Sequence, residues 1–123
     1  MAYHNELGKW GERKAIEYLE DKGYKILAHD WKSKRRDLDI VAAVGGKVVF
    51  VEVRTKRNDV FISPERSLMR KKLMSFYYAA NAFMRRYDIT CETRFDVITV
   101  IGTCDDDYFE IEHIEDAFLP PTI

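Results

Sequence analysis

The hydrophobic positions of this chain predict two amphipathic helices. Between Asn5 and Asp21, apolar residues recur at helical spacing, and Lys22-Gly23 then ends the pattern. Ser63-Pro64-Glu65 has the features of a second helix start, namely an N-cap residue, a first-turn proline and an acidic first turn. We assign these residues to the inward faces of the two helices: Leu7, Trp10, Ala15, Ile16 and Leu19, then Leu68, Leu73, Phe76, Tyr77, Tyr78, Ala80, Phe83 and Met84.

Runs of β-branched and aromatic residues outside these helices predict strands. Gly45-Gly46 separates two such runs and predicts a tight β-hairpin. A short closing helix is expected over 114–118. The element order is therefore α-β-β-β-α-β with a tail, and the predicted strands are Tyr24 to His29, Leu38 to Val44, Lys47 to Val53, Phe95 to Ile101 and Tyr108 to Ile111.

Composition limits the class of protein. The chain has 123 residues, of which 46% are hydrophobic and 33% charged, so we expect one folded domain over residues 1–123. No apolar run approaches the roughly 18 residues that cross a bilayer, and the first residues lack a signal-peptide pattern. We therefore expect a cytoplasmic protein without a membrane partner. The two cysteines, Cys91 and Cys104, form no CxxC pair and are expected to be free thiols.

Charge is distributed unevenly along the chain. The net charge is −1, but residues 32–72 hold twelve basic and five acidic residues, whereas residues 102–123 hold seven acidic residues and no Lys or Arg. A basic middle segment favours a nucleic-acid partner. The alternative is a balance of surface charge that serves solubility.

The hairpin contains the strongest candidate chemistry. If Gly45-Gly46 is a two-residue turn, Val44 pairs with Lys47, and the same register places Asp39 opposite Glu52. A three-residue turn would slip this register by one residue. Two facing carboxylates destabilise a sheet unless something compensates their charge, and a divalent cation would do so.

The predicted first helix adds a third acid. Glu12 shares the inward face of that helix with Ala15, Ile16 and Leu19. Three converging carboxylates would suit Mg²⁺ or Mn²⁺. The alternative is that Asp39 and Glu52 lie at exposed strand positions and that Glu12 only borders its helix face.

Basic residues near these acids could contact a phosphate. Arg54 and Lys56 alternate onto the Glu52 side of their strand, and Lys72 lies close to the inward edge of the second helix. Asp37 would face Arg54, either as an ion pair or as a further ligand. For Lys56 the alternative is a basic strand end in solvent.

The segment before the hairpin is also basic. Lys32, Lys34, Arg35 and Arg36 could follow a phosphate backbone while Trp31 stacks on a base. The alternative is a solvated loop with Trp31 in the core.

Six segments, in order and spacing, resemble the bacterial YraN-like family: GKWGERKAIEYLEDKGYKIL, RDLDIVA, VVFVEVRTK, SPERSLMRKKL, RFDVITV and IEHIEDAF. The resemblance covers nearly the whole chain. Members of that family are similar to PD-(D/E)XK nucleases and to archaeal Holliday-junction resolvases. The resemblance implies an α/β, restriction-endonuclease-like fold, with an α-β-β-β-α-β core and a mixed central sheet flanked by helices.

The resemblance also assigns roles by position. Glu12 matches the helical acid, Asp39 the motif aspartate, Glu52-Val53-Arg54 the (D/E)xK tripeptide, and Lys72 the basic residue of the following helix. Asp39 and Glu52, with the Val53 carbonyl, would then hold the metal. The sequence departs from the pattern at Arg54, where nucleases have lysine, and at Asp37, where the family usually has glutamate.

The leading hypothesis is a Mg²⁺- or Mn²⁺-dependent endonuclease that hydrolyses DNA, with branched DNA as one candidate substrate. Glu12, Asp39, Glu52 and Arg54 would form the catalytic site, and Lys56, Lys72, Arg35 and Arg36 would bind nucleic acid. Because arginine is never deprotonated at working pH, a nucleic-acid-binding module without cleavage is the alternative. A third hypothesis is an interaction protein whose acidic tail pairs with the basic middle of another subunit. A homodimer would fit a small nuclease by analogy.

Overall fold

The computed structural model describes residues 2–57, 66–103 and 108–117. It contains two helices and five strands in this order: α1 (Ala2–Asp21), β1 (Lys25–Ser33), β2 (Arg36–Val44), β3 (Lys47–Lys56), α2 (Arg66–Arg86), β4 (Glu92–Ile101) and β5 (Glu110–Ile114).

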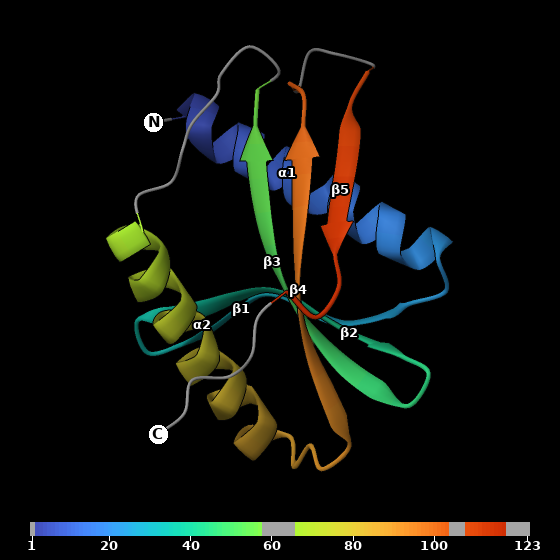
Figure 1. The fold of residues 1–123 in the computed structure, drawn as a ribbon, viewed down its shortest axis with the longest axis vertical. Coiled ribbons are helices and arrows are strands. Elements are labelled where there is room, and N and C mark those ends of the chain that lie inside the picture. Colours follow the sequence, from blue (N-terminus) through green and yellow to red (C-terminus); the bar gives the residue numbers. More distant parts are fainter. Residues whose placement is uncertain (1, 58–65, 104–107, 118–123) are drawn as a thin grey trace.

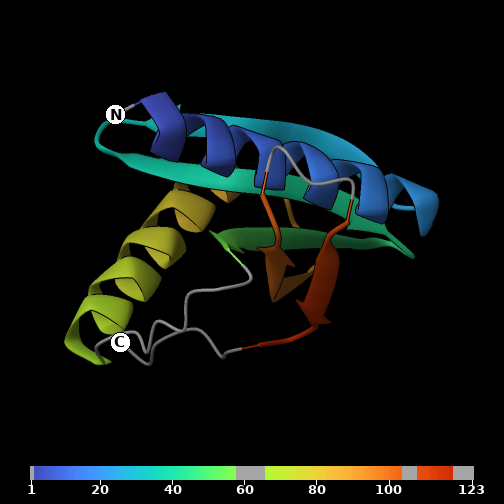
Figure 2. The same cartoon turned by 90° about the horizontal axis from the view of Figure 1, so that it is seen from above.

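The five strands form one mixed sheet in the order β1-β2-β3-β4-β5. Neighbours pair antiparallel except β3 and β4, which are parallel because the chain crosses over through α2 between them. α1 lies against one face of the sheet and α2 against the other (Figures 1 and 2). The predicted α/β core with a mixed sheet flanked by helices is thereby confirmed.

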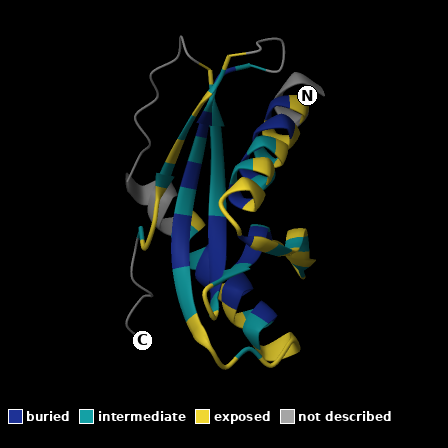
Figure 3. Ribbon diagram, turned by 90° about the vertical axis from the view of Figure 1, so that its right-hand side faces the viewer, coloured by how far each residue is buried: buried dark blue, intermediate teal, exposed yellow. Residues whose placement is uncertain are grey.

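Each helix buries one stripe against the sheet. The α1 side joins Trp10, Ala15 and Leu19 to inward residues of the strands, and the α2 side joins Phe76 and Phe83 to another set. Figure 3 shows buried positions along the inner strands and exposed ones on the outer surface of α1. The outer surfaces of both helices are charged, and neither helix in the described residues has the length and apolar character that crossing a membrane requires.

Several element boundaries differ from the predicted ones. β1 extends to Ser33, and β5 covers Glu110–Ile114 rather than 108–111. The closing helix is wrong over its described part, because Ile114 pairs with Val97 as a strand residue and residues 115–116 form a turn. The predicted helix start at Ser63-Pro64 lies outside the described residues, as does Cys104; Cys91 is an exposed free thiol.

Candidate active site

The hairpin turn sets the register that the candidate site depends on. Gly45 and Gly46 both have left-handed backbone conformations, with φ of 54° and 79°, as a two-residue type I′ turn requires. The β2–β3 ladder runs from Val44 opposite Lys47 to Ile40 opposite Val51. The predicted two-residue turn and its register are therefore confirmed over this ladder.

The ladder ends one pair before Asp39. Beyond Ile40 the backbone amide of Val53 donates a hydrogen bond of 2.8 Å to Asp39 Oδ2, so a side chain takes the place of a main-chain acceptor. Figure 1 shows β2 turning away from β3 at this point, while β3 continues beside β4. Asp39 and Glu52 thus lie at a fork between two strands and are not a regular cross-strand pair.

A break in the β2 alternation directs Asp39 into the fork. Leu38 packs on the α2 side although Ile40, two residues later, packs on the α1 side. On β1, Asp30 lies between the residues that pair with Leu38 and Ile40 and has a left-handed φ of 48°. Such a conformation is uncommon outside glycine, although aspartate tolerates it better than most residues. The sheet is therefore irregular on both strands at the level of Asp39.

Asp39 and Glu52 are both partly buried, and both carboxyls have a raised pKa. Burial and then the Asp39 charge raise the pKa of Glu52 to about 7, against the opposing influence of Lys72 and Arg54. Burial also raises the pKa of Asp39, and the Val53 amide only partly offsets this. The fold therefore holds two carboxylates together at an electrostatic cost.

Glu12 approaches Asp39 from the α1 side. Burial raises the pKa of Glu12 to about 7, and the charges of Asp39, Asp30 and Asp37 contribute in the same direction. The adjacent Gly11 lets α1 lie directly on β3, because a Cβ there would be 2.1 Å from Thr55 Oγ1. This close approach of α1 to β3 determines how deeply the Glu12 side chain is buried.

Glu52 occupies the other side of the fork. It lies on the same face of β3 as Val48 and Phe50, which pack toward α2. Lys72 of α2 lowers the pKa of Glu52 and that of Asp39. Asp39 thus influences both Glu12 and Glu52, and Asp37 does so to a smaller extent.

The donor set fits a cation held by two carboxylates. Within the described ranges, no three His, Cys, Asp or Glu side chains form a preassembled metal site. Asp39 and Glu52, with the Val53 carbonyl, are hard oxygen donors. Mg²⁺ commonly uses one or two carboxylates, with water and substrate phosphate as its other ligands. The arrangement therefore fits a two-carboxylate site with Glu12 beside Asp39 better than the three-carboxylate site considered from the sequence.

The basic residues that we predicted to contact a phosphate lie in different surroundings. Lys72 is exposed on α2 and acts electrostatically on both acids, and Arg54 acts on Glu52. Lys56 is the last residue of β3, and its carbonyl accepts a 2.9 Å hydrogen bond from the Gly102 amide. The expected cross-strand register of Asp37 opposite Arg54 is wrong, because the β2–β3 ladder ends at the pair of Ile40 and Val51.

The basic segment before β2 is a hairpin tip. Arg35 is exposed in the turn between β1 and β2, and the Arg36 guanidinium lies 4.6 Å from the ring centre of Tyr78. Trp31 packs edge-on against Phe83 at 5.2 Å within the α2-side core. The core interpretation of Trp31 is therefore correct, whereas Tyr78, predicted to be core, is 48% exposed.

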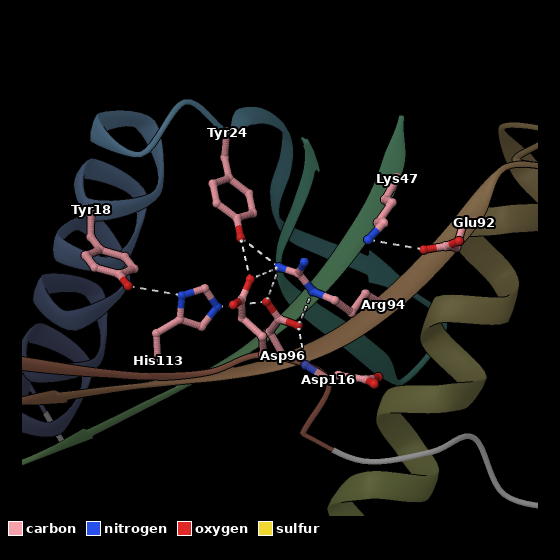
Figure 4. Close-up of polar contacts among 9 residues, drawn as sticks. Tyr18, Tyr24, Lys47, Glu92, Arg94, Asp96, His113 and Asp116 are labelled. Carbon is pink, nitrogen blue, oxygen red and sulfur yellow. Dashed lines mark hydrogen bonds and ion pairs between the residues drawn. The ribbon is translucent and has the colours of Figure 1, made fainter. Parts of the chain in front are cut away.

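The structure contains a second polar cluster that the sequence reasoning missed. Asp96 of β4 is fully buried and accepts hydrogen bonds from Arg94 Nε at 2.9 Å, Arg94 Nη2 at 2.8 Å and the Asp116 amide at 3.0 Å (Figure 4). His113 Nε2 lies 2.7 Å from Asp96 Oδ2, and its Nδ1 lies 3.1 Å from the Tyr18 hydroxyl. Because a carboxylate only accepts, Nε2 carries the donated proton.

This cluster connects parts of the chain that are far apart in sequence. Arg94 Nη2 also contacts the Tyr24 hydroxyl at 2.7 Å and Glu115 Oε1 at 3.0 Å. Burial alone would raise the pKa of Asp96, but the hydrogen bonds from His113, Arg94 and the Asp116 amide outweigh it and lower that pKa. The available signal was an acid inside an apolar strand with an arginine two residues earlier on the same face.

Comparisons with known proteins identify the family to which the chain belongs. A family model described as "Uncharacterised protein family UPF0102" matches residues 11–100, which include Glu12, Asp39, Glu52 and Lys72. A UPF0102 protein of Bacteroides thetaiotaomicron is 46% identical over 98% of both chains, and one of Phocaeicola vulgatus is 41% identical over 98% of both. A UPF0102 protein of Porphyromonas gingivalis is 40% identical over 96% of this chain and 87% of its own. The chain belongs to the UPF0102 family, the YraN family.

Proposed function

We propose that this protein is a metal-dependent phosphodiesterase that acts on nucleic acid, with DNA as the expected substrate. The observation that supports this most directly is the fork between β2 and β3. There, Asp39 and Glu52 are held together and partly buried, although burial raises both pKa values and the Asp39 charge raises that of Glu52 further. A fold tolerates such repulsion where a cation relieves it, and perturbed acids of this kind cluster at functional sites.

Each residue near the fork has a role in this proposal. Asp39 and Glu52, with the Val53 carbonyl, would hold Mg²⁺ or Mn²⁺, and the bound cation would supply Lewis-acid activation of the phosphate. Lys72 and Arg54 would stabilise negative charge that develops on the phosphate oxygens. Glu12, with a pKa near 7, is suited to accept a proton at neutral pH.

Binding without cleavage is the second candidate, and Arg54 favours it. A guanidinium stays protonated at working pH, so Arg54 can hold a phosphate and orient it but cannot accept a proton. A protein that keeps the basic surface while lacking a proton acceptor at this position would bind DNA and leave it intact.

Calorimetric titration of Mg²⁺ and Mn²⁺ tests the metal site directly. We expect heat of binding for the wild type, loss of that heat in Asp39→Asn, and wild-type behaviour in Glu92→Gln. Glu92 is a suitable control because it is an exposed acid of the same sheet, 3.3 Å from Lys47. A wild type that binds neither cation would contradict the proposal.

Incubation with labelled linear, flapped and four-way DNA then separates the two candidates. Metal-dependent cleavage that Asp39→Asn abolishes supports the phosphodiesterase. Binding without cleavage, with an affinity that falls steeply as salt rises, supports the binding module. If only an Arg54→Lys variant cleaves, the departure at Arg54 is what prevents the reaction.

A further inference from the structure

Arg36 and Tyr78 form an exposed cation–π pair beside the candidate site. Arg36 begins β2, and its guanidinium carbon lies 4.6 Å from the centre of the Tyr78 ring on α2. Tyr78 is 48% exposed, although its neighbours Tyr77 and Ala79 are buried at 7% and 1%. The pair therefore lies on the surface and adds little to the core.

The contact with Tyr78 restricts the orientation of the Arg36 guanidinium and so favours stacking of a ligand on it. A guanidinium is planar and weakly hydrated, and an aromatic ring beneath it holds the plane in place through cation–π attraction. Arg36 remains exposed despite this contact, so part of its plane is open to solvent. A flat, electron-rich ring could stack there without reorganising the side chain.

The pair is close to the carboxylates and on the side of the sheet from which Lys72 acts. Arg36 precedes Asp37, whose charge raises the pKa of Asp39 and Glu52. Asp39 is three residues along the strand from Arg36, roughly 10 Å at the rise of a β-strand. Arg35 and Lys34, which are exposed at the same hairpin tip, add positive charge that suits a phosphate backbone.

We propose that Arg36 and Tyr78 form a stacking subsite for an unpaired nucleobase next to the phosphate held at the fork. The inference rests on the proposed function and adds a substrate class to it. Bases inside a duplex stack on one another, so their planar faces are covered, whereas an unpaired base has an accessible face. The protein therefore prefers single-stranded, flapped or frayed nucleic acid to continuous duplex.

Fluorescence anisotropy in EDTA measures this preference while cleavage is blocked. The probes are a short fluorescein-labelled DNA oligonucleotide, its duplex, and RNA of the same sequence, which shows whether the base belongs to DNA or RNA. Tyr78→Ala should weaken single-strand binding about tenfold, the order expected for one stacked base, and leave duplex binding nearly unchanged. Tyr78→Phe should bind like the wild type because stacking does not need the hydroxyl.

Two further variants sharpen the test. Arg36→Lys keeps the charge but loses the plane, so it should lose single-strand preference while keeping duplex affinity. Tyr108→Ala removes a tyrosine that is 76% exposed and precedes β5, at the other edge of the sheet from β1, and should change nothing. Unchanged melting temperatures would show that the variants are folded.

The outcomes separate this inference from the proposed function. If Tyr78→Ala binds single strands as the wild type does, the subsite is wrong while the metal site stands. An equal loss on single strand and duplex would mean a charge contact and would also contradict stacking. A wild type that binds none of the probes in EDTA would contradict the subsite, whereas the proposed function is tested separately by the cation titration and the cleavage assay. Loss of metal binding without loss of single-strand preference in Asp39→Asn would support the subsite independently.

Discussion

At the scale of single residues, Glu52 shows the conflict between stability and function most clearly. It lies in β3 directly after the buried Val48-Val49-Phe50-Val51 run, and burial together with Asp39 raises its pKa to about 7. A polar but uncharged side chain at this position would avoid both the cost of burying a charge and the repulsion from Asp39. Packing of the sheet therefore does not account for the carboxylate, which agrees with the cation site that we propose.

Glu52→Gln should raise the melting temperature in metal-free buffer at pH 8. The variant removes a charge that burial and Asp39 oppose, and a gain of about 1 kcal/mol corresponds to roughly 4 °C for a domain of this size. Differential scanning calorimetry measures the shift, with Glu110→Gln on β5 as an exposed control. The gain should vanish when Mg²⁺ is present, because the metal would stabilise only the wild type. An unchanged or lower value would argue against repulsion at the fork.

At the scale of elements, the Asp96 cluster connects helix and strands on the α1 side. Tyr18 comes from α1, Arg94 and Asp96 from β4, His113 from β5, and the Asp116 amide from the turn that follows. In the described part of the chain, no buried side-chain nitrogen or oxygen lacks a hydrogen-bond partner. A cluster whose polar atoms are all paired is what a structural connection requires.

Asp96→Asn should destabilise the protein by about 3–5 kcal/mol, because it removes the buried charged partner of Arg94 and leaves that guanidinium with only the exposed Glu115 as a counter-ion. Urea denaturation followed by circular dichroism measures the change in the free energy of unfolding. Glu92→Gln, on the same strand, breaks only the exposed contact with Lys47 and should cost less than about 1 kcal/mol. Similar losses in both variants would show that the cluster is not a buried connection.

At the scale of the whole molecule, acids from separate elements make stability depend on pH. Glu12 of α1 and Glu52 of β3 each have a pKa near 7 in the folded protein, against 4.5 for an ordinary glutamate. Between these values the folded state binds more protons than the unfolded state, so stability falls as pH rises. Well above pH 7, both glutamates are ionised in the folded and in the unfolded protein, and their contribution to stability is lost.

The metal-free protein should therefore melt at a higher temperature at pH 5.5 than at pH 8. Calorimetry in EDTA-containing buffers measures the difference, and the double variant Glu12→Gln, Glu52→Gln should flatten it. Mg²⁺ should also reduce the difference, since it would stabilise the ionised carboxylates. A wild type that is more stable at pH 8 than at pH 5.5 would contradict the raised pKa values.

Local patterns in the sequence were sufficient to predict most elements and part of the site. Helical and strand periodicity identified both helices and the β2–β3 hairpin, because these depend on neighbouring residues. Gly45-Gly46 predicted the correct register because only glycine adopts two successive left-handed conformations easily. The bounds of β5 and the helix predicted after it were wrong, since the backbone there follows pairing with β4 rather than a local preference.

Long-range packing decided those features of the fold and of the candidate site that local patterns did not predict. The sequence by itself determined which acids lie near the fork, because turn register and helix periodicity place Asp39, Glu52 and Glu12. Only the tertiary structure decided that the strands part at Asp39, that Tyr78 is exposed under Arg36, and that Asp96 is buried with partners from its own strand, from β5 and from the turn after β5. These features depend on how α1, α2 and β5 pack on a bent sheet, and contacts between residues distant in sequence leave no periodic pattern in the chain.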